Sequence, residues 1–233
     1  MNYIHLESTG STNDYTREIA GSAALPALIT ADTQTAGRGR QGKSFYSPAG
    51  TGLYMTLLFE SPEQFSDITP AAAVAVCESI YSLTGTETLI KWVNDIYLGS
   101  KKICGILTER FEKDGRYYIA LGIGINLTTE GFPPELTQAG ALGKDIDKEK
   151  AAYDIAGRFF ELINSGNKIK LITEYEKRLK NIGKTVTYSI NSVSYCGTAT
   201  GIDSDYGLIV MRRDGTQDIL KSGEVSIKEI DAI

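Results

Sequence analysis

The spacing of apolar residues along the chain predicts four helices. In the stretch 147–166, apolar side chains recur every three or four positions, at Ala151, Ile155, Phe159 and Leu162, which is typical of a helix with one buried face. We also expect helices at 10–21, capped by Ser11 or Thr12, at 68–85, capped by Thr69 and ended by Gly85, and at 167–183, ended by Gly183.

Short runs rich in β-branched and aromatic residues predict strands between the helices. They lie at 27–30, 52–59 and 87–93, followed by three runs at 95–98, 102–111 and 116–127 that turn signals separate, at Gly99-Ser100 and Asp114-Gly115. The last three runs predict an antiparallel meander. Side chains alternate along a strand, so in 102–107 we expect Lys102, Cys104 and Ile106 on one face and Ile103, Gly105 and Leu107 on the other.

The pattern changes after Gly183, where short alternating segments follow one another between Asn, Asp and Gly turns. Such a series predicts a small barrel or sandwich of β-strands. We therefore expect two domains, 1–182 and 183–233. The first is of the α+β class, with a mixed or antiparallel sheet covered by helices.

Composition narrows the function classes. The chain has 233 residues, 42% of them hydrophobic, and a formal net charge of −5, so a general nucleic-acid binder is disfavoured. The three cysteines, Cys77, Cys104 and Cys196, are widely spaced, and they predict neither a disulfide framework nor a metal pair. The start of the chain lacks the pattern of a signal peptide, and no apolar stretch is long enough to cross a bilayer. We expect a cytoplasmic protein that does not bind a membrane.

The segment TAGRGRQGKSFYSP, residues 35–48, combines three glycines with Arg38, Arg40, Lys43 and Phe45. We call it the glycine loop. Glycines let a backbone approach a ligand, and arginines match phosphate or carboxylate groups with paired donors. The segment matches neither the P-loop nor the dinucleotide-binding fingerprint. It indicates an anion site, with a solvated basic loop as the simpler alternative.

Three other stretches carry candidate chemistry. KWVNDIYLGSKKICGI (91–106) brings lysines to strand ends and a turn, and a charged hairpin turn is the alternative reading. GIGIN (122–126) places Gly122, Gly124 and Asn126 on one strand face, where either a ligand or a packed helix comes close. STN (11–13) holds more hydrogen-bonding groups than a helix cap requires.

Together, in this order, these stretches resemble the biotin protein ligase family. The resemblance rests on STN (11–13), QTAGRGRQG (34–42), FYSP (45–48), GLY (52–54), KWVND (91–95), KKICGIL (101–107) and GIGIN (122–126). It implies a class II synthetase-like catalytic domain, and it implies, less specifically, that residues 183–233 form an SH3-like domain. Because the chain begins almost at the catalytic region, we expect the short form without an N-terminal DNA-binding winged helix.

The resemblance implies a two-step, ATP-dependent ligation. Biotin and Mg-ATP give biotinyl-5′-adenylate and pyrophosphate, and a lysine of a biotin carboxyl carrier domain of a biotin-dependent carboxylase then attacks the adenylate. Mg²⁺ accompanies ATP, and no protein side chain is assigned as a metal ligand. Relatives dimerise through the catalytic sheet, so a homodimer is one expectation. We expect the C-terminal domain to close over the adenylate or to help dock the carrier.

The family's motifs also imply roles for residues of this chain. The catalytic group consists of Arg40, Lys102 and Asp95, with Asp95 orienting or deprotonating the incoming lysine. Biotin contacts are implied for Ser11, Thr12, Asn13, Gln34, Arg38, Gly39, Arg40, Lys102 and Gly105. ATP contacts are implied for Arg38, Arg40, Phe45, Asn94, Lys102 and Asn126. The chain departs from the family at Val93, where proline is usual, and at Phe45, where tryptophan often stacks on adenine.

Two other functions stay open at this point. Lipoate ligases and octanoyl transferases share the fold, and the latter use a cysteine acyl intermediate, for which Cys104 is the candidate beside Lys102. A non-catalytic biotin sensor would keep the binding residues but lose Lys102 or Asp95, and this chain has both.

Overall fold

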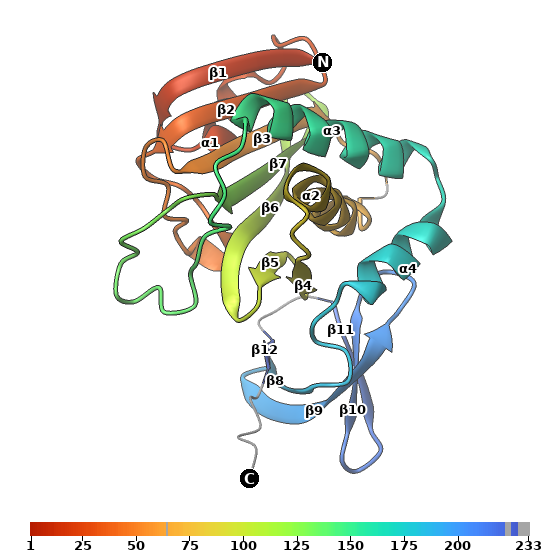
Figure 1. The fold of residues 1–233 in the computed structure, drawn as a ribbon. Coiled ribbons are helices and arrows are strands. Elements are labelled where there is room, and N and C mark those ends of the chain that lie inside the picture. Colours follow the sequence, from red (N-terminus) through yellow and green to blue (C-terminus); the bar gives the residue numbers. More distant parts are fainter. Residues whose placement is uncertain (64, 222–224, 228–233) are drawn as a thin grey trace.

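The computed structural model describes residues 1–63, 65–221 and 225–227. It contains two sheets and four α-helices (Figure 1). Three of the helices pack on the first sheet, and the fourth, at 168–177, lies between the helix at 68–84 and the second sheet. The helices are α1 (Thr12–Ile19), α2 (Ile68–Thr84), α3 (Lys148–Asn164) and α4 (Lys168–Lys177). Among the described residues, no helix has the length and apolar character needed to cross a bilayer.

The first sheet is mixed and has seven strands. Only β1 and β2 run parallel; the other neighbours are antiparallel. Their order across the sheet is β1-β2-β3-β7-β6-β5-β4. The strands are β1 (Asn2–Thr9), β2 (Ala27–Gln34), β3 (Gly52–Glu60), β4 (Leu89–Lys91), β5 (Asp95–Leu98), β6 (Lys101–Lys113) and β7 (Arg116–Asn126).

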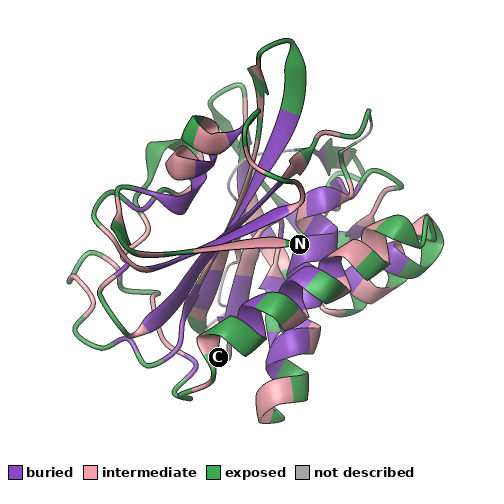
Figure 2. Ribbon diagram, turned by 90° about the horizontal axis from the view of Figure 1, so that it is seen from above, coloured by how far each residue is buried: buried purple, intermediate pink, exposed green. Residues whose placement is uncertain are grey.

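The sheet is sandwiched between helices, which explains its long apolar strands (Figure 2). Leu28, Leu57 and Leu121 point into the larger core, which α2 and α3 complete. Ile29 and Leu58, on the other face, pack with Ala20 at the end of α1. Successive residues of one strand thus serve opposite cores, as expected for a sheet buried on both faces. The α+β class predicted from the sequence is confirmed.

The second sheet is antiparallel and five-stranded. It contains β8 (Thr185–Ile190), β9 (Val193–Ile202), β10 (Leu208–Arg212), β11 (Gln217–Leu220) and β12 (Ser226–Ile227), in the order β11-β10-β9-β8-β12. The all-β character predicted after Gly183 is confirmed. Closure into a barrel and the boundary between domains 1–182 and 183–233 stay predictions, and residues 222–224 and 228–233 lie outside the described part of the chain.

Several local predictions are confirmed. Gly85 ends α2 with a left-handed backbone, at φ 70°. Asp114 and Gly115 also have positive φ, 52° and 75°, as a two-residue turn between β6 and β7 requires.

Other local predictions are wrong for identifiable reasons. Asp67, not Thr69, occupies the N-cap position of α2; Thr69 lies inside the helix, where its hydroxyl pairs with that of Thr108 at 2.7 Å. The helix α4 ends at Lys177 rather than at Gly183, because Leu179 forms a parallel bridge with Ile90. The strand predicted at 87–93 covers only Leu89–Lys91. The edge strand β1 was missed.

The face assignment along β6 is also wrong for Lys102 and Ile103, although it holds for the residues from Cys104 to Leu107. The register between β5 and β6 shifts, so that Ile96 pairs with Cys104 while its neighbour Tyr97 pairs with Lys102. One extra residue on β6 reverses the alternation, as a β-bulge does. Lys102 therefore shares a face with Gly105, whereas Cys104 is fully buried in the larger core.

This placement predicts very different reactivities for the three thiols. Burial raises the pKa of Cys77 to about 11 and the pKa of Cys104 well above its ordinary value, whereas Cys196 is exposed. The thiolate is the reactive form. A thiol reagent at pH 8 should therefore label Cys196 rapidly and the other two only after denaturation. The Cys196→Ser variant should be almost inert while folded, and rapid labelling of native Cys104 would contradict the assignment.

Candidate active site

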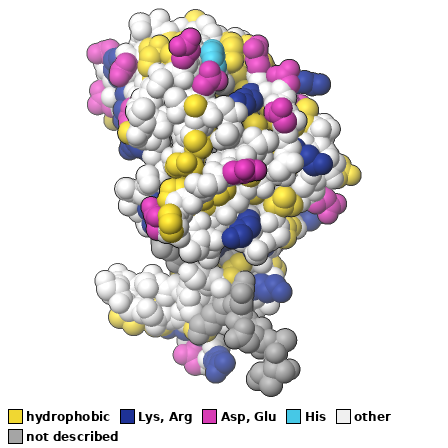
Figure 3. All heavy atoms as spheres, turned by 60° about the vertical axis from the view of Figure 1, so that its left-hand side comes forward, with side chains coloured by type: hydrophobic (Ala, Val, Ile, Leu, Met, Phe, Trp, Pro, Cys, Tyr) yellow, Lys and Arg dark blue, Asp and Glu magenta, His cyan; other side chains and the backbone are white. Residues whose placement is uncertain are grey.

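One cavity of about 660 Å³ opens between α1, the glycine loop, the β4–β5 turn and the segment 132–139. Figure 3 shows the side of the molecule on which these loops lie, where hydrophobic side chains mix with basic and acidic ones. All of the site residues predicted from the sequence line this cavity: Ser11, Thr12, Asn13, Gln34, Arg38, Gly39, Arg40, Phe45, Asn94, Asp95, Lys102, Gly105 and Asn126. Their individual roles stay predictions.

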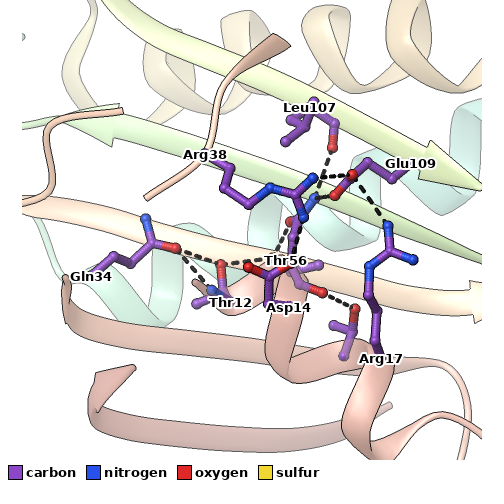
Figure 4. Close-up of polar contacts among 10 residues, drawn as sticks. Thr12, Asp14, Arg17, Gln34, Arg38, Thr56, Leu107 and Glu109 are labelled. Carbon is purple, nitrogen blue, oxygen red and sulfur yellow. Dashed lines mark hydrogen bonds and ion pairs between the residues drawn. The ribbon is translucent and has the colours of Figure 1, made fainter. Parts of the chain in front are cut away.

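One end of the cavity is a buried network of neutral polar groups. The backbone N–H and the hydroxyl of Thr12 both donate to Gln34 Oε1, at 2.9 and 3.1 Å. Thr56 Oγ1 donates to Asn13 Oδ1 at 2.7 Å and lies 2.8 Å from Thr12 Oγ1 (Figure 4). Ser11 occupies the N-cap position of α1, but its side chain makes no capping hydrogen bond. These groups therefore do more than cap a helix.

The cavity also holds cationic groups with different surroundings. Lys102 Nζ lies 2.7 Å from Asp95 Oδ1. Arg40 donates to the neutral side-chain oxygen of Asn94 at 3.0 Å, and the Asn94 amide in turn donates to Ile106 O at 2.9 Å. These contacts connect three elements of the site: Asp95 belongs to β5, Lys102 belongs to β6, and Arg40 belongs to the glycine loop.

Arg38 has a different environment from Arg40. Its guanidinium is paired with two carboxylates, those of Asp14 and Glu109. Although partial burial opposes the charged form, these two acids raise the pKa of Arg38 above its ordinary value. Figure 4 shows the guanidinium between them, above α1.

The glycines predicted to face a ligand lie under the chain's own side chains. A Cβ added at Gly124 would be 2.5 Å from the Phe45 ring, and one at Gly105 would be 3.3 Å from it. A Cβ at Gly122 would be 2.2 Å from Asn13 Oδ1. At Gly122 the alternative reading of the sequence, a helix packed against the strand, thus describes what is seen.

The segment 132–139 forms a wall of the cavity that the sequence did not reveal. Its backbone joins β6 beside Lys102: Lys102 N–H donates to Gln138 O at 2.8 Å, and Gly140 N–H donates to Lys102 O at 2.9 Å. Phe132, Leu136 and Gln138 line the cavity. Nothing in the polar, proline-containing sequence of this loop indicates such a bridge, because it depends on tertiary placement.

The turn that carries Asn94 and Asp95 is anchored from the C-terminal part of the chain. Trp92 is buried, and its indole N–H donates to Tyr206 O at 2.9 Å. Its backbone N–H donates to Asn181 Oδ1 at 2.8 Å, and Tyr175 donates to Val93 O at 2.8 Å. The peptide bond between Trp92 and Val93 is cis. Val225 and Ser226 also line the cavity, so both parts of the chain build the site.

The model of the biotin/lipoate A/B protein ligase family matches residues 6–126. The chain is a member of this family. No group of three or more His, Cys, Asp and Glu side chains in the described ranges is placed to hold a metal ion.

Individual relatives agree with this membership. The bifunctional ligase/repressor BirA of Bacillus spizizenii is 32% identical, over 93% of this chain and 71% of that one. The biotin–[acetyl-CoA-carboxylase] ligase of Mycobacterium tuberculosis is 28% identical, over 93% and 85%. Among solved structures, the biotin protein ligase from Aquifex aeolicus in complex with biotin and ATP is 26% identical and superposes with a TM-score of 0.85, covering 98% of this chain and 99% of that one.

The glycine contacts generate a prediction about stability. Gly122→Ala should lower the free energy of unfolding by about 1–3 kcal/mol, because buried Asn13 must leave its hydrogen bonds. Gly124→Ala should have a smaller effect, because the Phe45 ring end can move. Gly157→Ala, in α3 with open space around it, is the control and should stabilise by up to about 1 kcal/mol. Urea denaturation measures all three, and equal losses at Gly122 and Gly157 would contradict the packing.

The anchor of Trp92 generates a second prediction. Trp92→Phe keeps an aromatic ring but removes the N–H that satisfies Tyr206 O, so unfolding should become easier by about 1–3 kcal/mol. Tyr153→Phe, an exposed ring on α3, is the matched control. A Trp92→Phe variant as stable as this control in urea denaturation would show that the indole hydrogen bond is unimportant.

Proposed function

We propose that the protein is a biotin–[biotin carboxyl-carrier protein] ligase, which attaches biotin to a lysine of a carrier domain through biotinyl-5′-adenylate. The observation that carries the proposal is one cavity that joins a buried neutral polar end to two cations, Arg40 and Lys102. The first end suits an uncharged ring with polar edges, and the second suits a carboxylate and a phosphate. The relatives named as biotin ligases support biotin as the carboxylic acid that the cavity binds.

In the first step, a carboxylate oxygen of biotin attacks the α-phosphorus of Mg-ATP, and the bond to pyrophosphate breaks. Both reactants are anionic, so their repulsion must be reduced before they can meet. We assign this task to Arg40 and Lys102. Asp95 Oδ1 holds Lys102 Nζ at 2.7 Å and thereby fixes the position of this cation beside Gly105.

In the second step, a lysine amine of the carrier attacks the acyl carbon, and AMP leaves. A free lysine is mostly protonated near neutral pH. Its ammonium group releases a second proton as the amide forms, but it must lose a first proton before the amine can attack. We assign Asp95 to orient the incoming amine and accept this proton. Its Oδ1 faces Lys102, so Oδ2 is the atom we assign to the amine.

The remaining contacts follow from the polarity of the lining. We propose that Ser11, Thr12, Asn13, Gln34 and Gly39 contact the biotin ring. We propose that Phe45, Asn94 and Asn126 contact the nucleotide. Asn126 Oδ1 is buried with no hydrogen-bond partner among the described residues, while its Nδ2 donates to Gly140 O at 3.0 Å. A buried acceptor of this kind supports a ligand that donates a hydrogen bond.

The partners and the compartment complete the proposal. The substrates are biotin and Mg-ATP, and the protein partner is the carboxyl carrier domain of a biotin-dependent carboxylase. The net charge of −5 argues for a protein partner rather than DNA. A cytoplasmic location agrees with three free cysteines.

Lipoate or octanoate ligation is the alternative within the same fold. An acyl-cysteine route would need Cys104 in the cavity, and this residue lies fully buried in the core on the other side of β6. A sensor without activity would have no use for the Lys102–Asp95 pair. Biotin ligation therefore fits the geometry best.

Exchange of labelled pyrophosphate into ATP tests the first step. We expect exchange with biotin, and none with lipoate, octanoate or no added acid. Arg40→Ala and Lys102→Ala should each reduce exchange on the order of 10²-fold, because each removes a charge that stabilises the transition state. Lys177→Ala, which removes an exposed lysine at the end of α4 outside the cavity lining, is the control. Exchange with lipoate alone would favour the alternative, and tight biotin binding without exchange would favour a sensor.

A further inference from the structure

Glu109 on β6 has no role in the proposed chemistry, yet it is the most connected carboxylate beside the cavity. Its side chain is only 16% exposed. Oε1 accepts from Arg38 at 2.7 Å and from Arg17 at 3.2 Å, and Oε2 accepts from Asn13 Nδ2 at 3.0 Å (Figure 4). One side chain thus joins the glycine loop, the helix α1 and the polar end of the cavity.

The contacts of Arg38 occupy both ends of its planar guanidinium. Nη1 donates to Asp14 and Nη2 donates to Glu109. Asp14 belongs to α1 and Glu109 to β6, so Arg38 ties the glycine loop to two separate elements. A planar fork held by two carboxylates is a geometrically defined contact, which a single flexible cation would not provide. We call these three residues the Arg38 clamp.

The same carboxylate fixes the orientation of Asn13. A carboxylate only accepts hydrogen bonds, so the Asn13 amide must turn its NH₂ group toward Glu109. Its Oδ1 then faces Thr56 Oγ1, at 2.7 Å, over Gly122. The orientation of a group that we assign to biotin and the position of the glycine loop therefore depend on one residue.

We infer that Glu109, together with Asp14, is a positioning residue that fastens the glycine loop over the cavity through Arg38. In this account Arg38 is the anchor of the loop, and Arg40 and Lys102 are the cations that meet the phosphate. The choice of biotin as the ligand under the loop rests on the proposed function, but the anchoring itself does not.

Limited proteolysis tests the anchoring without any ligand. Trypsin cleaves after Arg38, Arg40 and Lys43 in the glycine loop. The rate of cleavage after Arg40 and Lys43, which every variant keeps, therefore reports how often the loop opens. We expect Glu109→Gln, Asp14→Asn and Arg38→Gln to raise this rate by about 10-fold. Arg38→Lys, which keeps a charge but not the fork, should fall between them and the unaltered protein.

Arg17→Gln is the matched control. Arg17 pairs with the same Oε1 of Glu109, but it belongs to α1 and stacks on Phe111 at 4.7 Å rather than holding the loop. It should leave cleavage of the loop within about twofold of the unaltered protein. Equal cleavage of Glu109→Gln and the unaltered protein would overturn the inference, as would equal effects of Arg17→Gln and Arg38→Gln.

Kinetics of the exchange reaction separate an anchor from a phosphate ligand. An anchor predicts that Arg38→Gln and Glu109→Gln each raise the KM for biotin, and that the double variant raises it by less than the product of the two factors, since both variants break the Arg38–Glu109 contact. The KM for ATP should change by less than about threefold. A larger rise in the KM for ATP in Arg38→Gln alone would make Arg38 a phosphate ligand and overturn the inference. If no variant or parent shows exchange, the proposed function fails while the proteolysis result still decides the anchoring.

Discussion

The extra residue in β6 is the constraint on which the site depends. Without the register shift opposite Ile96 and Tyr97, regular alternation would turn Lys102 away from Gly105 and into the apolar core. A charged amine there would be strongly disfavoured. With the shift, Lys102 reaches Asp95 across the β5–β6 pair at 2.7 Å, while Ile103 and Cys104 both lie buried in the apolar core.

Around this pair, the cavity is assembled from segments that are distant in the sequence. Thr12 and Gln34 meet on one side, and the segment 132–139 is bridged to Lys102 on the other. Trp92 ties the turn before Asp95 to Tyr206. Each contact is an ordinary hydrogen bond, but each also fixes a strand end or loop that carries a functional group. The C-terminal part of the chain therefore supports the site, because its residue Tyr206 holds the turn that carries Asp95.

Long periodic segments and glycine-containing turns could be predicted from the sequence, because their causes are local. The helix ending at Gly85 and the hairpin at Asp114-Gly115 are examples. The predicted site residues could be anticipated from the family's motifs, whereas the part of the lining formed by 132–139 could not. What could not be predicted depends on tertiary contacts: the end of α4 at the Ile90–Leu179 bridge, the partner of Thr69, and the face on which Lys102 lies. The pairing of Arg38 with Asp14 and Glu109 belongs to the same group, since it joins three separate elements.

The central claim is that this cavity transfers biotin to a protein lysine, and the complete reaction tests it most directly. The purified protein would be incubated with biotin, Mg-ATP and the carrier domain of a biotin-dependent carboxylase, and the carrier would be weighed by mass spectrometry. The account predicts that the carrier gains one biotinyl group on a single lysine, and only when ATP is present. A carrier whose mass does not change would contradict it. In a second incubation with biotin, lipoate and octanoate together, a carrier that gains a lipoyl or octanoyl group instead of biotin would also contradict it.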